Sequence, residues 1–364
     1  MVGVLVAVAH TLNASQLHAA LAQTWPPFVL VSGLLLIGLV AGRDGLFDAA
    51  ASRLMRFPGP PPALLLACFS LVAVVTALLN LDTSAVFLTP VLIRVAQRRR
   101  IDAAPFLYGA IFMANASSLF LPGSNLTNLL VLSGEHVSGG AFFTNMLPAA
   151  LTASLLTAAG LLVIHRRQLL RVDRGSSPGR AEPVPLALGL GFWGALLAAV
   201  LILVLRDAAL PVLAVGLLLV ARRAQRGELC LSEALTELGA PALLGLFLLS
   251  VLLGTVARAS AFPADAIHSA GAPLTAVVAA LASIVINNLP AAVLLSATRS
   301  AHPGALLLGL NVGPNLAVTG SLAVLLWWRA ARACGISPSA FAYSRQGLLL
   351  APIAIIAALA VGGG

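Results

Sequence analysis

The sequence predicts an all-α polytopic membrane protein with two inverted-topology repeats, each containing a re-entrant helical hairpin and a discontinuous helix. Three observations predict this fold: an apolar composition, apolar segments interrupted by polar residues, and the recurrence of these interruptions in both halves. Hydrophobic residues make up 60% of the 364 residues and charged residues 9%, with a mean hydropathy of +1.01. Soluble domains contain about 25% charged residues, so many membrane spans are expected.

Several of the apolar segments are too short to cross a bilayer alone, because a helical span needs about 20 residues. Polar residues or proline join the segments 62–79 and 84–97, and likewise the segments 272–286 and 291–298. We interpret each pair as a re-entrant helical hairpin. The apolar segments lie near 27–42, 62–79, 84–97, 105–121, 147–164, 186–205, 208–221, 240–257, 272–286, 291–298, 304–328 and 346–362.

Two further stretches, 105–134 and 304–328, are interrupted by Gly, Pro, Asn and Ser. These interruptions predict discontinuous helices. Non-helical backbone is tolerated at membrane depth only where protein or a water-filled cavity covers it. We therefore expect both interruptions to lie inside the protein.

The arginines predict the orientation of the chain, which contains 21 basic residues and no lysine. We assume that each hairpin returns to the side of the membrane from which it entered. One side of the membrane then carries every arginine except Arg206, Arg258 and Arg299. The positive-inside rule makes the arginine-rich side cytoplasmic. The first hairpin then opens inward and the second outward. Trp25, Trp327 and Trp328 lie at predicted span ends, as interfacial anchors do.

One polar stretch, residues 166–185, reads "RRQLLRVDRGSSPGRAEPVP". Its Gly, Ser, Pro and Arg content predicts a solvated cytoplasmic linker. This linker separates a first membrane repeat, residues 1–165, from a second membrane repeat, residues 186–364.

The two halves resemble each other in order along the chain. "LNLDTSAVFL" aligns without gaps on "INNLPAAVLL", and "NASSLFLPGSNLTNLL" aligns on "NVGPNLAVTGSLAVLL". With a third match, of "AGRDGLF" on "VARASAF", the alignments pair Asn80 with Asn287, Asn115 with Asn311, and Arg43 with Arg258. Inverted repeats with helices broken near the midplane are typical of secondary transporters.

Small polar residues gather at the predicted interruptions. A broken helix leaves free N–H groups at one new end and free C=O groups at the other, and amide or hydroxyl side chains can complete a binding site there. Alternatively, individual Ser and Thr residues join neighbouring helices by hydrogen bonds. The predicted substrate- or ion-binding residues are Asn80, Asp82, Thr83, Ser84, Asn115, Ser118, Ser124, Asn125, Thr127, Asn287, Asn288, Asn311, Asn315, Thr319 and Ser321.

Of the 12 acidic residues, only Asp82 falls inside the predicted membrane region, between the two arms of the first hairpin. An ionisable group inside the membrane costs several kcal/mol to insert, which makes it a functional hypothesis. Burial favours the neutral form of a carboxyl group, so Asp82 is a candidate to exchange a coupling proton. The alternative is that Asp82 caps the hairpin tip by accepting a backbone N–H.

Other classes of protein find little support in the sequence. It contains no P-loop, no HExxH pair and no triad-like motif, so we predict neither an enzyme nor a cofactor or metal site. Cys68, Cys230 and Cys334 lie too far apart for a metal-binding motif. The net charge of +9 is better explained by membrane topology than by binding to nucleic acid.

The stretches "ALLNLDTSAVFLTPVLI", "SSLFLPGSNLTNLLV", "SIVINNLPAAVLL" and "GPNLAVTGSLAVLLWW" resemble the arsenical pump membrane protein family, the arsenite-efflux permeases of the ion transporter superfamily. The resemblance covers most of the chain from about residue 27. It implies a homodimeric permease of the inner (plasma) membrane that exports arsenite or antimonite, driven by the proton gradient. Some members of the family also work with a soluble ATPase.

The sequence departs from the family pattern at several of these residues. The family typically has Asn at the position of Leu81, often Asp at the positions of Asn115 and Asn311, and Lys at the position of Asn315. The N-terminus is shorter than the family's by about two helices. Two alternatives within the superfamily stay open, a sodium- or proton-coupled symporter of anions such as carboxylates, and a sodium/proton antiporter. The antiporter calls for more than one buried carboxylate, whereas the sequence offers only Asp82.

Overall fold

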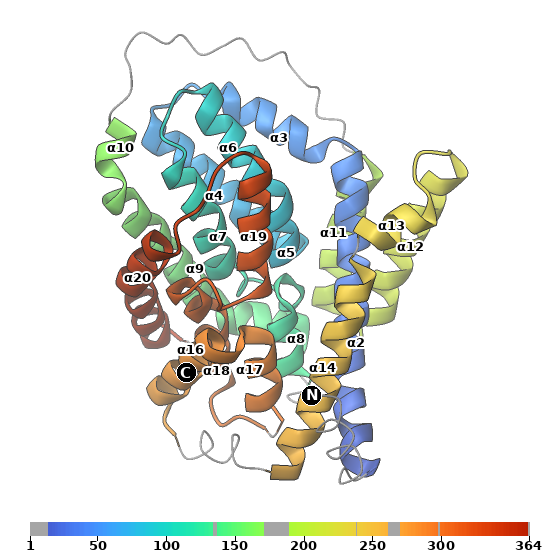
Figure 1. Cartoon of the computed structure of the whole chain (residues 1–364). Helices are drawn as coiled ribbons and strands as arrows, with labels where there is room; N and C mark the ends of the chain where they lie inside the picture. The colour runs from blue at the N-terminus through green and yellow to red at the C-terminus, as the bar shows by residue number, and fades with distance from the viewer. Residues whose placement is uncertain are drawn as a thin grey trace.

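The computed structural model describes residues 14–133, 137–170, 189–237, 239–260, 270–297 and 299–362. The described residues form helices and connecting segments, without any β-strand (Figure 1). The predicted all-α class is therefore confirmed. The predicted linker begins in a short helix at residue 166, and its residues 171–185 lie outside the described part of the chain.

The helices before the linker contain the first hairpin and the first discontinuous helix. They are α2 (Ala14–Arg43), α3 (Leu46–Met55), α4 (Pro61–Leu78), α5 (Leu81–Thr83), the π-helix η1 (Ser84–Leu88), α6 (Thr89–Arg98), α7 (Ala104–Ser117), the 3₁₀-helix η2 (Pro122–Ser124), α8 (Leu126–Leu132), α9 (Gly139–Ile164) and α10 (Arg166–Leu170). Prolines occupy the first turn of α4, α6 and α7. Proline is tolerated there because the backbone N–H groups of a first turn have no hydrogen-bond partner within the helix.

The helices after the linker contain the second hairpin and the second discontinuous helix. They are α11 (Leu190–Val204), α12 (Ala209–Gln225), α13 (Leu231–Glu237), α14 (Ala240–Ser260), α16 (Ala272–Ile286), α17 (Asn288–Leu295), α18 (Pro303–Val312), the 3₁₀-helix η3 (Gly313–Leu316), α19 (Leu322–Ala333) and α20 (Ala340–Ala360). Within the described residues, five helices, α2, α4, α9, α14 and α20, are long and apolar enough to cross a membrane.

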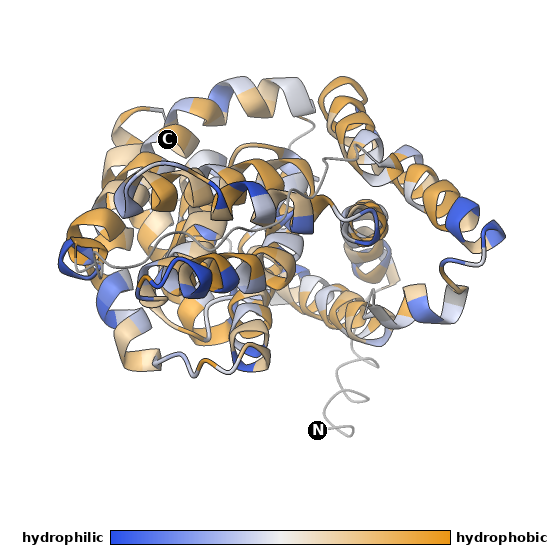
Figure 2. Ribbon diagram, turned by 90° about the horizontal axis from the view of Figure 1, so that it is seen from above, coloured by the Kyte–Doolittle hydropathy of each residue, from blue (hydrophilic) through white to orange (hydrophobic). Residues whose placement is uncertain are grey.

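The outer surface is suited to lipid rather than water. Large apolar side chains such as Leu155 and Ile356 are about two-thirds exposed, and Val285 is 80% exposed. Figure 2 shows hydrophobic residues along most of the helical ribbon and hydrophilic residues mainly at helix ends and connecting segments. In water such exposure would cost free energy, whereas a bilayer offers these side chains an apolar solvent.

The helices form two groups that lie side by side in Figure 1. In one group, α2 packs against α11, α12 and α14. The other group contains both hairpins and both discontinuous helices, with α4 against α7, α16 against α18, and α9 against α20. The first hairpin opens toward the end of the molecule that bears α3 and α10, and the second opens toward the opposite end. This arrangement agrees with inverted repeats, which remain a prediction.

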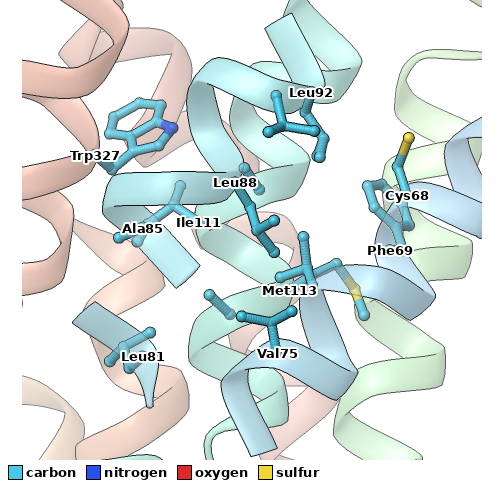
Figure 3. Packing of buried hydrophobic residues seen from close by; sticks show 14 of the residues in the cluster. Cys68, Phe69, Val75, Leu81, Ala85, Leu88, Leu92, Ile111, Met113 and Trp327 are labelled. Carbon is cyan, nitrogen blue, oxygen red and sulfur yellow. The ribbon is translucent and has the colours of Figure 1, made fainter. Parts of the chain in front are cut away.

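The core of the first hairpin is a large hydrophobic cluster. Figure 3 shows Val75, Leu88 and Met113 in this cluster, together with Trp327 from α19. Trp327 is fully buried, and its indole N–H donates a hydrogen bond of 2.8 Å to the carbonyl of Leu107. The expectation of an interfacial anchor at Trp327 is wrong, because α19 turns this side chain toward α7 instead of toward lipid.

Close packing between α2 and α12 depends on glycine. A Cβ on Gly33 would lie 2.7 Å from the backbone of Val212 and Leu213, whereas a Cβ on Gly245 in α14 would meet nothing within 4 Å. We expect Gly33→Ala to separate the two helices and to cost about 1–3 kcal/mol, as overpacking does. Gly245→Ala should be neutral or stabilising, because alanine favours helix. Thermal unfolding in detergent measures both, and equal midpoints would contradict this packing.

Candidate functional site

The tip of the first hairpin is closed by Asn80. Its Oδ1 accepts a hydrogen bond of 2.7 Å from the backbone N–H of Thr83, so Asn80 is the N-cap of the second arm. The hydroxyl of Thr76 donates to that of Ser84 at 2.8 Å and joins the two arms. Asp82 therefore does not cap the tip, which removes the purely structural alternative for its role.

Asp82 lies in the first turn of the second arm, half-buried, and it faces a cavity beside α2, α14 and α19. The arm continues as a π-helix from Ser84 to Leu88 before it becomes the α-helix α6. A π-helical turn inside a helix is rare and is found mostly at functional sites. The sequence placed Asp82 in a polar interruption, whereas the structure places it on a continuous helical arm.

The tip of the second hairpin is closed by Asn287, the residue that aligns with Asn80. Its Oδ1 accepts from the backbone N–H of Leu289 at 3.3 Å, and its amide donates to the carbonyl of Thr319 at 3.2 Å. The backbone N–H of Asn288 also donates to the carbonyl of Gly320 at 2.9 Å. The second hairpin is thus hydrogen-bonded to the second interruption.

The same kind of contact joins hairpin and interruption in the first half. The hydroxyl of Ser124 donates to the carbonyl of Ala77 at 3.3 Å, three residues before Asn80. In the second half, the hydroxyl of Thr319 donates to the carbonyl of Ile284 at 2.8 Å, three residues before Asn287. The two acceptors, Ala77 and Ile284, are aligned positions, and Thr319 lies one residue before the position aligned with Ser124. Similar contacts at nearly the same positions support the proposed relation between the halves.

The backbone of Asn287 is held in an unusual conformation, with φ at +75° and ψ at +149°. Residues other than glycine rarely adopt positive φ, and such strain costs about 1–3 kcal/mol. We expect Asn287→Gly to be better tolerated than Asn287→Ala, because both lose the side-chain bonds but only glycine relieves the strain. Thermal unfolding of the purified variants should show the alanine variant to be less stable by about 1 kcal/mol or more, and the reverse order would contradict the strain.

The two interruptions meet in a buried network of amides. Asn311 Oδ1 accepts from the hydroxyl of Ser118 at 2.6 Å and from the amide of Asn125 at 2.7 Å. Its own amide donates to Asn128 Oδ1 at 2.8 Å and to the carbonyl of Leu307 at 2.8 Å. Nearby, the amide of Asn115 donates to Asn315 Oδ1 at 2.8 Å. Residues more than 180 positions apart in the chain are thereby brought together.

Helix N-termini also point into this region. Asn125 caps α8, and Ser321 caps α19 by accepting from the backbone N–H of Val324 at 3.3 Å. With the caps of the two hairpin arms, four helical segments begin at the interior interruptions. Free N–H groups at such ends favour polar oxygens and negative charge.

All but three of the predicted site residues are buried. The exceptions are Asp82 and Asn287, which are half-buried, and Thr319, whose side chain is exposed. The buried members are Asn80, Thr83, Ser84, Asn115, Ser118, Ser124, Asn125, Thr127, Asn288, Asn311, Asn315 and Ser321.

Four buried polar atoms at the site have no hydrogen-bond partner among the described residues: Asn80 Nδ2, Thr83 Oγ1, Asn115 Oδ1 and Thr127 Oγ1. All four belong to the first half. Buried polar groups in native proteins are nearly always paired, so unpaired ones call for an explanation. A transported molecule or ion provides one.

Sequence reasoning left two polar residues out of the predicted site. Asn128 lies one turn beyond Asn125, and its amide donates to the carbonyl of Ser118 at 2.7 Å. Gln23 lies in the long apolar helix α2, where its amide donates to Ser296 and its Oε1 accepts from Arg258. Asn128 could have been predicted from the sequence, because it lies three residues after Asn125 and therefore near the same face of the helix. Gln23 could not, because it is a single amide in an apolar helix.

Re-entrant hairpins and interrupted helices whose polar ends meet inside an apolar bundle define a multi-pass membrane transporter. Residues 1–323 match the family model of the citrate transporter family, CitMHS. The chain belongs to this family.

Individual relatives cover most of the chain. The arsenical pump membrane protein of Escherichia coli (strain K12) is 25% identical over 357 residues, which are 90% of this chain and 83% of that protein. A 46 kDa membrane protein of Mycobacterium leprae (strain TN) is 23% identical over 91% of this chain and 84% of its own length. The silicon efflux transporter LSI3 of Oryza sativa subsp. japonica is 27% identical, over 46% of this chain and 34% of that protein.

One solved structure supports the fold. The YdaH transporter of Alcanivorax borkumensis aligns with a TM-score of 0.52 at 13% sequence identity, covering 95% of this chain and 86% of that chain. The resemblance to the arsenical pump membrane protein family is confirmed by relatives of that name.

Proposed function

We propose that the protein exports arsenite or antimonite as a secondary active transporter coupled to the proton gradient. The observation that carries the proposal is the chemistry of the inter-repeat network, in which amides and hydroxyls supply every side-chain hydrogen bond. Arsenous acid is a small neutral trihydroxide at neutral pH. Its three hydroxyls both donate and accept hydrogen bonds, as amide and hydroxyl side chains also do.

Asp82 supplies the proton step in this proposal. It is the carboxylate at the hairpin tip, and the unpaired atoms of Asn80 and Thr83 lie on either side of it in sequence. A proton bound at Asp82 on one face of the membrane and released on the other would couple the proton gradient to export. The unpaired atoms of Asn115 and Thr127 make the first interruption the second part of the binding site.

A second candidate is a proton- or sodium-coupled carboxylate symporter, and the description of the matching family as citrate transporters favours it. A tricarboxylate requires positive charge or several free helix N-termini. The four interior helix starts could supply the latter, whereas no arginine takes part in the described hydrogen bonds of the amide network.

Uptake into everted membrane vesicles distinguishes these functions. Everted vesicles expose the cytoplasmic face, so export appears as accumulation. We expect accumulation of arsenite and antimonite that depends on an imposed proton gradient and stops when an uncoupler collapses the gradient. Vesicles from cells carrying the empty vector are the control. Uptake of citrate without movement of arsenite or antimonite would replace the leading proposal with the second candidate.

A further inference from the structure

A cavity of about 380 Å³ lies between the two groups of helices. The first hairpin contributes Asp82 and Val86, α2 contributes Leu39, and α19 contributes Leu326 and Arg329. Its only charged lining residues, among those the structure describes, are Asp82 and Arg329. Nothing so far assigns a role to this cavity or to Arg329.

The cavity extends from the hairpin tip toward the arginine-rich end of the molecule. Leu322, Leu326 and Arg329 follow one face of α19 at helical spacing and all line the cavity. Leu322 and Arg329 are seven positions apart, so at a rise of 1.5 Å per residue they are separated by about 10 Å along the helix axis. Gly239, at the start of α14, lies on the same wall. The cavity is thus lined from Asp82, at the hairpin tip, to Arg329, near the C-terminal end of α19.

Some arginines at that end have partners that Arg329 lacks. Arg43 pairs with Glu233 at 2.5 Å, and the guanidinium holds the pKa of that carboxyl below its usual range. Arg223 pairs with Asp44 and with Glu228, and Arg332 lies over the ring of Trp328. Arg329 is exposed and forms no ion pair with any residue that the structure describes.

A cation without an ion-pair partner contributes a positive potential to its end of a largely apolar cavity, because the low-dielectric walls weaken screening. Such a potential repels cations, and it lets neutral or anionic molecules pass. A pathway that ends at a carboxylate needs this protection, since Asp82 would otherwise attract sodium or other cytoplasmic cations. Arginine suits the role because it stays charged at any physiological pH.

We propose that this cavity is the cytoplasmic access path to Asp82, and that Arg329 filters it against cations. The inference rests on the proposed function only in taking Asp82 as the end of the path. The occupant of the cavity is water together with the small oxyacid that passes through it. A lipid chain entering between α14 and α19 is the competing occupant.

The test measures access and charge selectivity without any substrate. Val86→Cys, one turn beyond Asp82, is introduced into a background with Cys68→Ala, Cys230→Ser and Cys334→Ser. Everted vesicles are treated with membrane-impermeant thiosulfonates that carry either a sulfonate or a trimethylammonium group. The ratio of the two reaction rates, divided by the same ratio for free glutathione, reports the potential at Val86→Cys.

We expect both reagents to modify Val86→Cys, with the sulfonate favoured. Arg329→Glu should lower the normalised ratio by roughly tenfold, which is the size expected when a charge on the order of 10 Å from the thiol is reversed. Arg329→Gln should lower it less. Arg345→Glu makes the same charge change at an exposed residue of α20 that does not line the cavity, and should change the ratio by less than about twofold.

Two results would overturn the proposal. One is a Val86→Cys that reacts with a membrane-permeant maleimide but with neither impermeant reagent, which is the result expected of a lipid-filled cavity. The other is a rate ratio that Arg329→Glu leaves unchanged. Because the assay needs no arsenite, a failure of the arsenite-export proposal would show separately in the uptake experiment.

Discussion

Replacing Asp82 by asparagine is expected to abolish proton-driven export while the protein still folds and inserts. Asparagine has nearly the same shape as aspartate and retains hydrogen-bonding groups, but it cannot bind and release a proton. The fold should survive because the hairpin tip is capped by Asn80 and the arms are joined through Thr76 and Ser84. None of these contacts involves the Asp82 side chain.

The measurement compares two transport modes in everted vesicles. Net accumulation of arsenite against its gradient should fall to the level of empty-vector vesicles. Exchange of labelled for unlabelled arsenite at equal concentrations should persist, because exchange requires binding and movement but no net proton transfer. The combination separates a coupling defect from a binding defect, which a single uptake value cannot do.

Asp48→Asn is the matched control. Asp48 is also a helical aspartate, but its side chain is 63% exposed and lies 3.8 Å from Arg94. Exposed ion pairs contribute little, so this variant should transport normally. Full pH-coupled accumulation by Asp82→Asn would show that the proton is carried elsewhere. Loss of both accumulation and exchange would place Asp82 in substrate binding instead.

The elements that the sequence predicts well are those at which the chain must stop being a helix. Asn80 and Asn287 stand in otherwise apolar stretches and cap the second arms of the two hairpins. Asn125 and Ser321 begin the second parts of the two interrupted helices. Such residues are recognisable because a cap needs a short polar side chain at one particular position.

The contacts across the protein are not predictable in the same way. Asn311 aligns with Asn115, yet in the structure it bonds to Ser118, Asn125 and Asn128. The pairing of the amide side chains depends on how the interrupted helices cross each other. A local sequence pattern contains no information on that crossing. The alignment therefore predicts that the interruptions correspond, but not how they interlock.

Burial is also poorly encoded in an apolar membrane protein. In a soluble protein an alternation of polar and apolar residues marks the buried face of a helix. Here the lipid-facing and the protein-facing sides are both apolar, as buried Trp327 and exposed Val285 illustrate. The cavity lined by Asp82 and Arg329 could not be predicted for the same reason. The sequences of α2, α14 and α19 do not indicate which face of each helix lines it.

Asn311 is expected to be the residue of the amide network whose loss is most destabilising. Asn311→Leu keeps the branched shape of the side chain but removes all of its hydrogen-bonding groups. The amide of Asn125 and the Oδ1 of Asn128 would then lose a buried partner. The hydroxyl of Ser118 is less affected, because it also donates to the carbonyl of Asn115 at 2.7 Å.

Each buried polar group left unpaired costs about 1–3 kcal/mol, so two of them cost roughly 2–6 kcal/mol. We expect the thermal unfolding midpoint in detergent to fall by roughly 5–15 °C. Asn311→Asp keeps both acceptor contacts and loses the two donor contacts, to Asn128 Oδ1 and to the carbonyl of Leu307, so its midpoint should lie between those of the wild type and the leucine variant. This order follows from the number of bonds lost and not from side-chain size.

Ser283→Ala provides the matched control for a buried polar group. Ser283 is fully buried in α16, but its hydroxyl bonds only to the carbonyl of Ala279 in the same helix. Its removal leaves no other side chain unpaired and should shift the midpoint by no more than about 2–4 °C. If Asn311→Leu shifted the midpoint no further than Ser283→Ala, the amides would not be holding the two interruptions together. The network would then act as lining for the transported molecule, with its stability supplied by the apolar packing around it.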